Sequence, residues 1–364
     1  MKPPTPLGAL LRGAGLLALG LLAAVSGEGA VRWRDVLDQP DAWYASPEAR
    51  RAAENVLLYQ TASGGWPKNH DMTRPPRPED FTGEDVTAPT IDNGATYTQI
   101  RLLARVNAAQ ADPRLQAAIR RGLDYLFAAQ YPTNGGWPQF YPLLPGYYTH
   151  ITFNDDAMVG VLGVLRDVAR GTPPFDWLDA PTRARAAAAV GKGVACILRC
   201  QIVVNGVKTA WCAQHDENTF EPVPARTYEH ESLSGFESVG IVRFLMSLDP
   251  PSPEVVAAVR AAVAWFEQSR IQGLRVQLIP APGLPHGADR RVVPDPAAPP
   301  LWARFYEIGT NRPIFSGRDA VIRYRLDEIE AERRAGYRWY VEDPRQLLEK
   351  DYPAWAARWV NGTR

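Results

Sequence analysis

The feature that most constrains the fold is an internal repeat with a period near seventy residues. A glutamine closes each of four stretches that carry helical signals, and the glutamines are spaced by 70, 71 and 67 residues. They are Gln60, Gln130, Gln201 and Gln268. A unit of this length is typical of two helices joined by a loop, which bury their apolar faces only against neighbouring units. The repeat therefore predicts a serial array of helical hairpins.

Helix signals inside the repeats support this prediction. Ser46-Pro47-Glu48 and Ser252-Pro253-Glu254 each combine an N-cap serine, a first-turn proline and an acid. Residues 113–130 carry apolar side chains at the three-four spacing of an amphipathic helix. A second helix is expected after each loop, at 95–106, 157–168 and 239–248. We predict an all-α protein, an α/α toroid built as an incomplete barrel of helical hairpins, with long loops that carry the site and little β structure.

The first thirty residues differ from the rest of the chain. Lys2 and Arg12 precede an apolar run over residues 13–25, and small residues follow. This run of 13 residues suits a signal-peptide core and is shorter than the ~20 residues of a membrane-spanning helix. We expect residues 1–30 to be a secretory signal peptide and residues 31–364 to be one catalytic domain. The protein should then be exported to the periplasm or the medium, with no membrane association after signal removal.

Charge and cysteine content narrow the classes of partner. Lys and Arg total 40, as do Asp and Glu, so no basic surface points to nucleic acid and no protein partner is evident. The three cysteines are an odd number, and Cys196 and Cys200 stand one helical turn apart without a zinc-site spacing. We interpret them as buried apolar residues and assign them no chemistry.

Carboxylates gather where the loops lead into the second helices. The first loop ends in Thr90-Ile91-Asp92-Asn93-Gly94-Ala95-Thr96 and the second in Phe153-Asn154-Asp155-Asp156-Ala157-Met158. A single acid here is explained by helix capping alone. Three acids that converge from two repeats exceed what capping needs, and oxygen ligands favour a hard cation such as Ca²⁺. The predicted calcium ligands are Asp92, Asp155 and Asp156.

The third and fourth loops supply arginines, and a lysine follows the first Gly-Gly-Trp-Pro. Each arginine alone is explained by a surface ion pair. Together with the nearby aromatic residues they suit a ligand with carboxylates on sugar rings, because guanidinium grips a carboxylate and an aromatic face packs on C–H groups. The residues concerned are Lys68, Arg226, Arg304, Arg312, Trp66, Trp137 and Tyr306.

These residues lie in six ordered motifs, and with them the chain resembles the pectate lyases of polysaccharide lyase family 10 over nearly its whole mature length. The resemblance implies an α/α toroid that needs calcium and cleaves de-esterified polygalacturonate by β-elimination, giving 4,5-unsaturated oligogalacturonides. The motifs are Gly64-Gly65-Trp66-Pro67-Lys68, the two loop ends above, Ala225-Arg226-Thr227-Tyr228-Glu229, Trp302-Ala303-Arg304-Phe305-Tyr306-Glu307 and Thr310-Asn311-Arg312-Pro313-Ile314-Phe315.

The resemblance also implies roles for single residues. Arg226 is then the base that removes the C5 proton, and Asp92 together with Asp155 or Asp156 brings in calcium. Residue chemistry alone favours Lys68 as the base, because the pKa of arginine lies above 12. An arginine base implies an alkaline rate optimum. The implied substrate-binding residues are Lys68, Arg304, Arg312, Asn93, Trp66 and Tyr306.

Two other functions use the same residues. An inverting glycoside hydrolase would employ Asp92 and Asp156 as acid and base, but it leaves the arginines and Lys68 without a role. A non-catalytic protein that binds pectin fragments would employ the arginines and aromatic residues. Substitution of Arg226 separates them, because only a lyase should lose turnover while binding persists.

Overall fold

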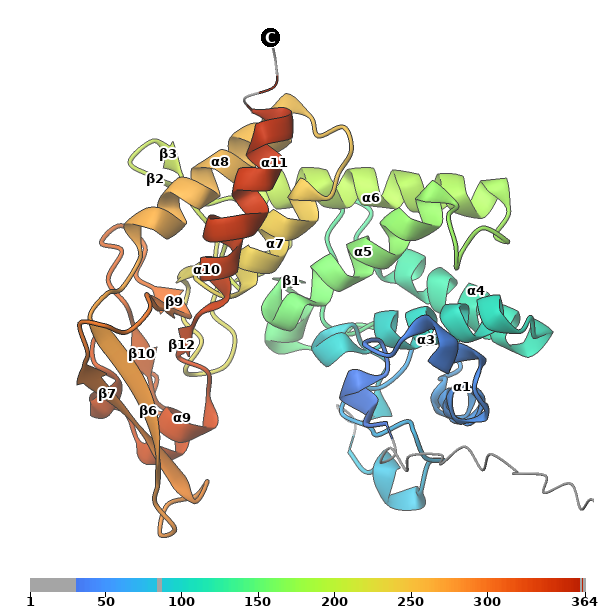
Figure 1. The fold of residues 1–364 in the computed structure, drawn as a ribbon, viewed down its shortest axis with the longest axis horizontal. Coiled ribbons are helices and arrows are strands. Elements are labelled where there is room, and N and C mark those ends of the chain that lie inside the picture. Colours follow the sequence, from blue (N-terminus) through green and yellow to red (C-terminus); the bar gives the residue numbers. More distant parts are fainter. Residues whose placement is uncertain (1–30, 84–86, 361, 363–364) are drawn as a thin grey trace, which may run out of the picture. The chain divides into compact units, whose positions relative to one another are not determined.

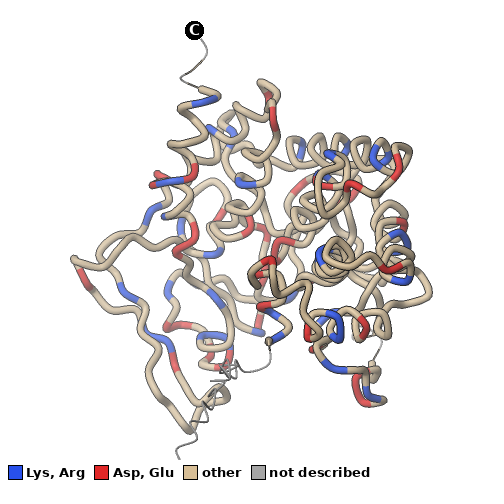
Figure 2. The backbone as a smooth tube through the Cα atoms, turned by 45° about the vertical axis from the view of Figure 1, so that its right-hand side comes forward, with Lys and Arg blue, Asp and Glu red and all other residues tan. Residues whose placement is uncertain are grey.

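The computed structural model describes residues 31–83, 87–360 and 362, so the segment predicted to be a signal peptide lies outside the described residues. Arg32–Arg364 forms one compact unit. Within the described part of the chain, no helix combines the length and apolar character needed to cross a membrane. Figure 2 shows basic and acidic positions interspersed along the chain.

Helices in two rows build most of this unit (Figure 1). The inner helices α3, α5 and α7 contact one another in sequence, while α1 contacts α4 and α6 contacts α8 in an outer row. The C-terminal helical segment packs its π-helical turn, Leu347–Asp351, against α7 and α8. The bounds are α1 Pro47–Tyr59, α3 Tyr97–Ala109, α4 Pro113–Ala129, α5 Ala157–Arg170, α6 Ala180–Cys200, α7 Glu237–Met246, α8 Pro253–Gln268, α9 Ala331–Gly336, α10 Asp343–Gln346 and α11 Tyr352–Trp359. The α/α toroid prediction is confirmed.

The helix boundaries follow the capping signals. Ser46, Asp112 and Ser252 each accept a hydrogen bond from a backbone N–H of the first turn, as the sequence predicts. The first of the second helices begins at Tyr97 rather than at Ala95, because Thr96 has a φ of 66° that no helical residue adopts.

Three of the four repeat glutamines bond one repeat to the next. Nε2 of Gln60 donates to the carbonyls of Gly64, at 2.8 Å, and Ala118, at 2.9 Å. Gln130 and Gln201 make the same pair of bonds, one to their own loop and one to the following outer helix. Gln268 is instead the exposed last residue of α8, and no such bond is present among the described residues.

Four buried tryptophans add a second recurring tie. Each indole N–H donates to a carbonyl in the last turns of the preceding outer helix, at 2.7 to 2.8 Å. The tryptophans are Trp66, Trp137, Trp211 and Trp302, all without exposed surface. Gly64 lies close beside the first, with a φ of +96°, and a Cβ there would stand 2.3 Å from the carbonyl oxygen of Arg121 in α4. Only glycine permits this approach of the loop to the next helix.

The β structure is limited to short antiparallel pairs and one longer hairpin. That hairpin pairs β6 (Leu274–Pro280) with β7 (Ala288–Pro294). The two-residue strands are β1 Ile151–Thr152, β2 Val203–Val204, β3 Val207–Lys208, β4 Gln214–His215, β5 Leu233–Ser234, β8 Trp302–Ala303, β9 Phe305–Tyr306, β10 Phe315–Ser316, β11 Ile322–Arg323 and β12 Tyr340–Val341. A buried cluster that includes Tyr228, Phe305 and Trp339 packs against Val292 of β7, so the arginine-bearing loops share a core with the hairpin. The three cysteines are free and buried.

Candidate active site

The loop ends before α3 and α5 share one backbone conformation. Asn93 and Asp155 have φ values of 50° and 48°, and the residues after them, Gly94 and Asp156, have 80° and 61°. Consecutive left-handed residues are rare, and Asn, Asp and Gly tolerate them best. The two short 3-10 turns also contact each other, so equivalent loops from two repeats meet.

A polar pocket of about 160 Å³ opens between these loops and the third loop. It brings together five of the predicted residues, Lys68, Asp92, Asn93, Asp155 and Arg226. Its other lining residues are Asn69, Gln139, Tyr147, Asn154, Gln214 and Glu229. Carboxylate and amide oxygens therefore share one small pocket with the positively charged side chains of a lysine and an arginine.

Asp92 has one satisfied and one unsatisfied oxygen. Its Oδ2 accepts from Lys68 Nζ and from Gln139 Nε2, each at 2.7 Å. Its Oδ1 is buried and has no hydrogen-bond partner among the described residues. A buried carboxylate oxygen without a partner is costly, and a bound cation would satisfy it.

Asp155 forms an ion pair with a buried arginine. Its Oδ2 accepts from Asn154 at 2.9 Å and its Oδ1 pairs with Arg304 Nη2 at 3.0 Å. Arg304 also pairs with Glu237. Burial lowers the pKa of Arg304, but the charges of Glu237 and Asp155 outweigh it and hold that pKa above its ordinary value.

Arg226 forms a two-point ion pair with Glu229. Its Nε donates to Glu229 Oε2 at 2.7 Å and its Nη2 to Oε1. Tyr337 donates its hydroxyl to Glu229 Oε1 at 2.6 Å. Burial alone lowers the pKa of Arg226, but the hydrogen bonds and charge of Glu229 reverse this, so its pKa lies above the ordinary value. The same pair holds the pKa of Glu229 low despite its burial.

Four predicted site residues need correction. Trp66 and Tyr306 are 0% and 1% exposed, so neither ring can stack on a sugar, and both bond to backbone carbonyls instead. Arg304 is 4% exposed and does not line the pocket, so it supports Asp155 rather than contacting substrate. Asp156 occupies the left-handed position of Gly94 and packs against Gly240 of α7, away from the pocket lining.

Arg312 lies outside the pocket lining as well. Its exposed guanidinium stacks on Tyr324 at 3.5 Å from the ring centroid. The structure therefore does not bring Arg312 together with Arg226 in one pocket.

Sequence reasoning missed several residues of the pocket. Gln139 follows the second Gly-Gly-Trp-Pro as Lys68 follows the first, so alignment of the repeats indicates it. Asn154 stands at the position of Asp92 in the second loop. Tyr147 and Gln214 carry no comparable signal.

A different group of side chains has ligand atoms close enough to hold a metal. Atoms of His150, Asp216 and Glu217 lie within 4.8 Å of one another. His150 and Glu217 already pair at 3.0 Å, and Asp216 accepts from the backbone of its own turn. This group contains none of the predicted ligands.

Comparison with known proteins identifies the family. The family model described as pectic acid lyase matches residues 60–348. The chain belongs to the pectic acid lyase family. A family 10 polysaccharide lyase from Cellvibrio cellulosa is 37% identical, with a TM-score of 0.74, over 88% of this chain and 94% of that one. An aspartate-to-alanine mutant of that lyase, in complex with trigalacturonic acid, is also 37% identical to this chain. It has a TM-score of 0.74 over 89% of this chain and 98% of that one. No curated protein matches the chain.

Membership of the pectic acid lyase family confirms the predicted enzyme class. The hydrolase alternative also fails on geometry, because it needs Asp92 and Asp156 to face each other across a sugar. Asp92 lines the pocket and is bound to Lys68, whereas Asp156 does not line it. The lyase interpretation gives both Lys68 and Arg226 a role in the reaction.

Proposed function

We propose that this protein is an exported lyase that cleaves de-esterified polygalacturonate by calcium-assisted β-elimination and releases 4,5-unsaturated oligogalacturonides. The observation that carries the proposal is one polar pocket that joins Asp92 and Asp155 with Lys68 and Arg226. Without a bound cation, the two acids would repel the carboxylate of a uronate. If Lys68 and Arg226 alone bound the uronate, the two acids would have no role. The trigalacturonic acid bound by the related lyase supports the same substrate class.

Asp92 and Asp155 are the residues that would hold calcium. The donor set around them is rich in oxygen, and the free Oδ1 of Asp92 fits a hard cation. A bound calcium would withdraw charge from the uronate carboxylate and so acidify the proton on C5. Lys68, which is held by its ion pair with Asp92, would add a second positive charge beside the uronate carboxylate.

In this proposal Arg226 takes the C5 proton. In the reaction the C5–H bond breaks, its electron pair forms the C4–C5 double bond, and the C4–O bond breaks. The departing oxygen takes a proton from water, and the hydroxide that remains removes the proton that Arg226 has taken. Glu229 and Tyr337 fix the guanidinium of Arg226 in place, but their interaction also disfavours its neutral form. The reaction should therefore accelerate as pH rises into the alkaline range.

The first test follows the ultraviolet absorbance of unsaturated product from polygalacturonate at alkaline pH, with calcium and then with chelator. We expect absorbance that rises with calcium, stops with chelator and is lost in Arg226→Ala. The matched control is Arg51→Ala, which removes an exposed arginine of α1 outside the pocket lining. Reducing ends without this absorbance would show hydrolysis and refute the proposal.

Export is tested separately. If residues 1–30 are a signal peptide, the secreted protein should begin near residue 31, as N-terminal sequencing of the mature form would show. Retention of Met1 in secreted protein would contradict this part of the proposal.

A further inference from the structure

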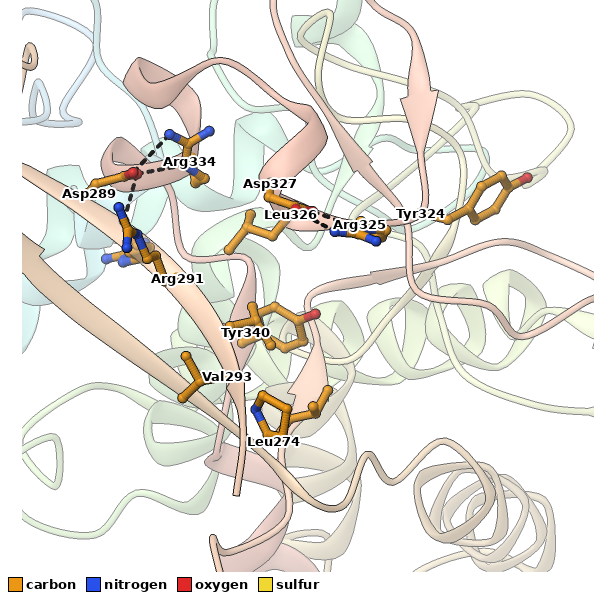
Figure 3. Close-up of a pocket in the computed structure, with 13 residues that line it drawn as sticks. Leu274, Asp289, Arg291, Val293, Tyr324, Arg325, Leu326, Asp327, Arg334 and Tyr340 are labelled. Carbon is orange, nitrogen blue, oxygen red and sulfur yellow. Dashed lines mark hydrogen bonds and ion pairs between the residues drawn. The ribbon is translucent and has the colours of Figure 1, made fainter. Parts of the chain in front are cut away.

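A second, larger cavity of about 780 Å³ lies outside the candidate active site. It is bordered by β7 and by the segment that carries Tyr324, Arg325 and Asp327, and it shares no lining residue with the polar pocket. In Figure 3, Asp289 and Arg334 lie on one side of the view and Tyr324 and Arg325 on the other. Nothing in the proposed reaction uses this cavity.

The charges in this cavity do not balance. Arg334 neutralises Asp289 through two bonds of 2.6 and 2.9 Å, and Arg325 neutralises Asp327 in the same two-point manner. Two further arginines of β7, Arg290 and Arg291, also line the cavity. Within the part of the chain that the structure describes, no ion pair joins either guanidinium to a carboxylate, and the guanidinium of Arg290 donates to the carbonyl of Tyr337. The lining therefore carries two uncompensated positive charges.

The protonation equilibria agree with this count. Burial and the positive charge of Arg338 lower the pKa of Arg290. The pKa values of Arg325 and Arg334 are raised instead, chiefly by the hydrogen bonds that they donate to their carboxylate partners. Arg290 therefore sits in a positive environment that an anion would relieve.

The remaining lining suits a sugar rather than a small inorganic ion. The half-buried Tyr340 offers ring surface, and Leu274 and Val293 add apolar contact. Tyr324, 38% exposed, also borders the cavity, and the guanidinium of Arg312 stacks on its ring. Aromatic and aliphatic surface packs on the C–H faces of a sugar ring, while guanidinium groups bind carboxylates. The volume also exceeds that of the polar pocket.

We propose that this cavity is an accessory binding site for a uronate oligosaccharide, separate from the site of cleavage. The choice of a uronate rests on the proposed function, which makes such chains the polymer that the protein meets. Tyr337 stands between the two sites, since its carbonyl accepts from Arg290 and its hydroxyl donates to Glu229. The accessory site would hold polymer close to the cleavage site without taking part in the chemistry.

The experiment uses the full chain in the Arg226→Ala background, so that the ligand is not consumed. Trigalacturonate is titrated calorimetrically in chelator, which weakens binding at the calcium-dependent site. We expect Arg291→Ala to weaken the remaining binding about tenfold and Arg291→Glu to abolish it. Arg291→Lys should retain most of the affinity. Arg291 is exposed, and its side chain forms no hydrogen bond or ion pair with another described residue beyond its charge interaction with Asp289, so these variants should fold. Arg51→Ala is the matched charge control.

Two ligand controls define the class. Fully methyl-esterified trigalacturonate, which lacks the charges, should bind at least about tenfold more weakly. Inorganic phosphate that competes as well as trigalacturonate would show a small-anion site and overturn the uronate assignment. Unchanged binding in Arg291→Glu would overturn the accessory site while leaving the lyase proposal intact. Binding that depends on Arg291, in a protein that forms no unsaturated product, would support the accessory site and refute the lyase proposal.

Discussion

At the residue scale, the ion pair between Arg226 and Glu229 is the contact that most affects the proposed chemistry. It orients the guanidinium by two bonds, and it also stabilises the protonated form that cannot accept a proton. Orientation and basicity therefore oppose each other at one side chain. Lys68, the base favoured by residue chemistry alone, forms its ion pair with Asp92 instead, and among the described residues it makes no hydrogen bond or ion pair with Arg226 or Glu229.

Glu229→Gln separates the two bases. Loss of the carboxylate charge removes the main interaction that raises the pKa of Arg226, so the neutral base forms at lower pH. The acid limb of the kcat/KM profile should then shift to lower pH by about one unit. Tyr337→Phe, which removes a hydrogen bond to Glu229 but no charge, is the control and should shift it less. An unmoved acid limb in Glu229→Gln would favour Lys68 as the base.

Asp156 should make stability depend on pH. Burial, and after it the charges of Glu237 and Asp155, raise its pKa to about 6. Because the folded-state pKa exceeds the unfolded one, the stabilising contribution is complete below about pH 4 and is lost as pH rises through about 6. Asp156→Asn, which tolerates the left-handed backbone, should raise the free energy of unfolding by about 1–3 kcal/mol near pH 8 and little below pH 4.

The measurement is denaturant unfolding across pH in chelator. Asp124→Asn, at an exposed ion pair, is the control and should leave the profile unchanged. A wild-type profile that stays flat between about pH 4 and pH 7 would contradict the raised pKa of Asp156.

At the element scale, the fold is a chain of helical hairpins bonded in series. Each tie runs from a glutamine to its own loop and to the outer helix of the next repeat, as with Gln130, Gly135 and Ala189. The tryptophan ties lie alongside and bond the same loop back to the preceding helix. The loops that carry the pocket are thus fixed at both flanks.

Gln130→Ala should lower the free energy of unfolding by about 1–3 kcal/mol, because it removes the hydrogen bonds that Gln130 donates to the carbonyls of Gly135 and Ala189. Gln268→Ala is the matched control, since this repeat glutamine is exposed, and its effect should stay within about 0.5 kcal/mol. Chemical denaturation of both variants measures the difference. Equal losses in the two would show that the tie contributes nothing specific.

Much of this arrangement could be predicted because it is local or periodic. Capping residues such as Ser46 and the glutamine spacing mark the hairpins, and the loop ends before the second helices mark Asp92 and Asp155 of the pocket. The failures have physical causes. The pair of aspartates did not indicate the left-handed backbone that directs Asp156 towards α7. The position of Trp66 in a loop motif did not indicate that its ring is completely buried. The long-range pairing of Arg304 with Asp155 and Glu237 has no local signal.

At the scale of the whole molecule, the proposed calcium site joins two repeats. Asp92 precedes α3 and Asp155 precedes α5, and each loop is part of a different hairpin. A cation held by both would stabilise the folded protein, because the unfolded chain cannot present the two acids together.

Calcium should therefore raise the melting temperature, with a stabilisation of about 2.7 kcal/mol at a concentration one hundred times the dissociation constant. Asp92→Asn should remove this calcium-induced increase. Asp216→Asn, in the separate His150 group, should retain it. Differential scanning calorimetry with calcium and with chelator provides the comparison. Loss of the increase in Asp216→Asn alone would move the calcium site to that group.

The shared oxygen of Asp92 makes two successive repeats depend on each other. Lys68 and Gln139 occupy equivalent positions in these repeats, yet both donate to a single carboxylate oxygen in the first repeat. The two repeats are therefore complementary at this site rather than interchangeable. Replacing one repeat by a copy of the other would leave that oxygen without one of its two donors.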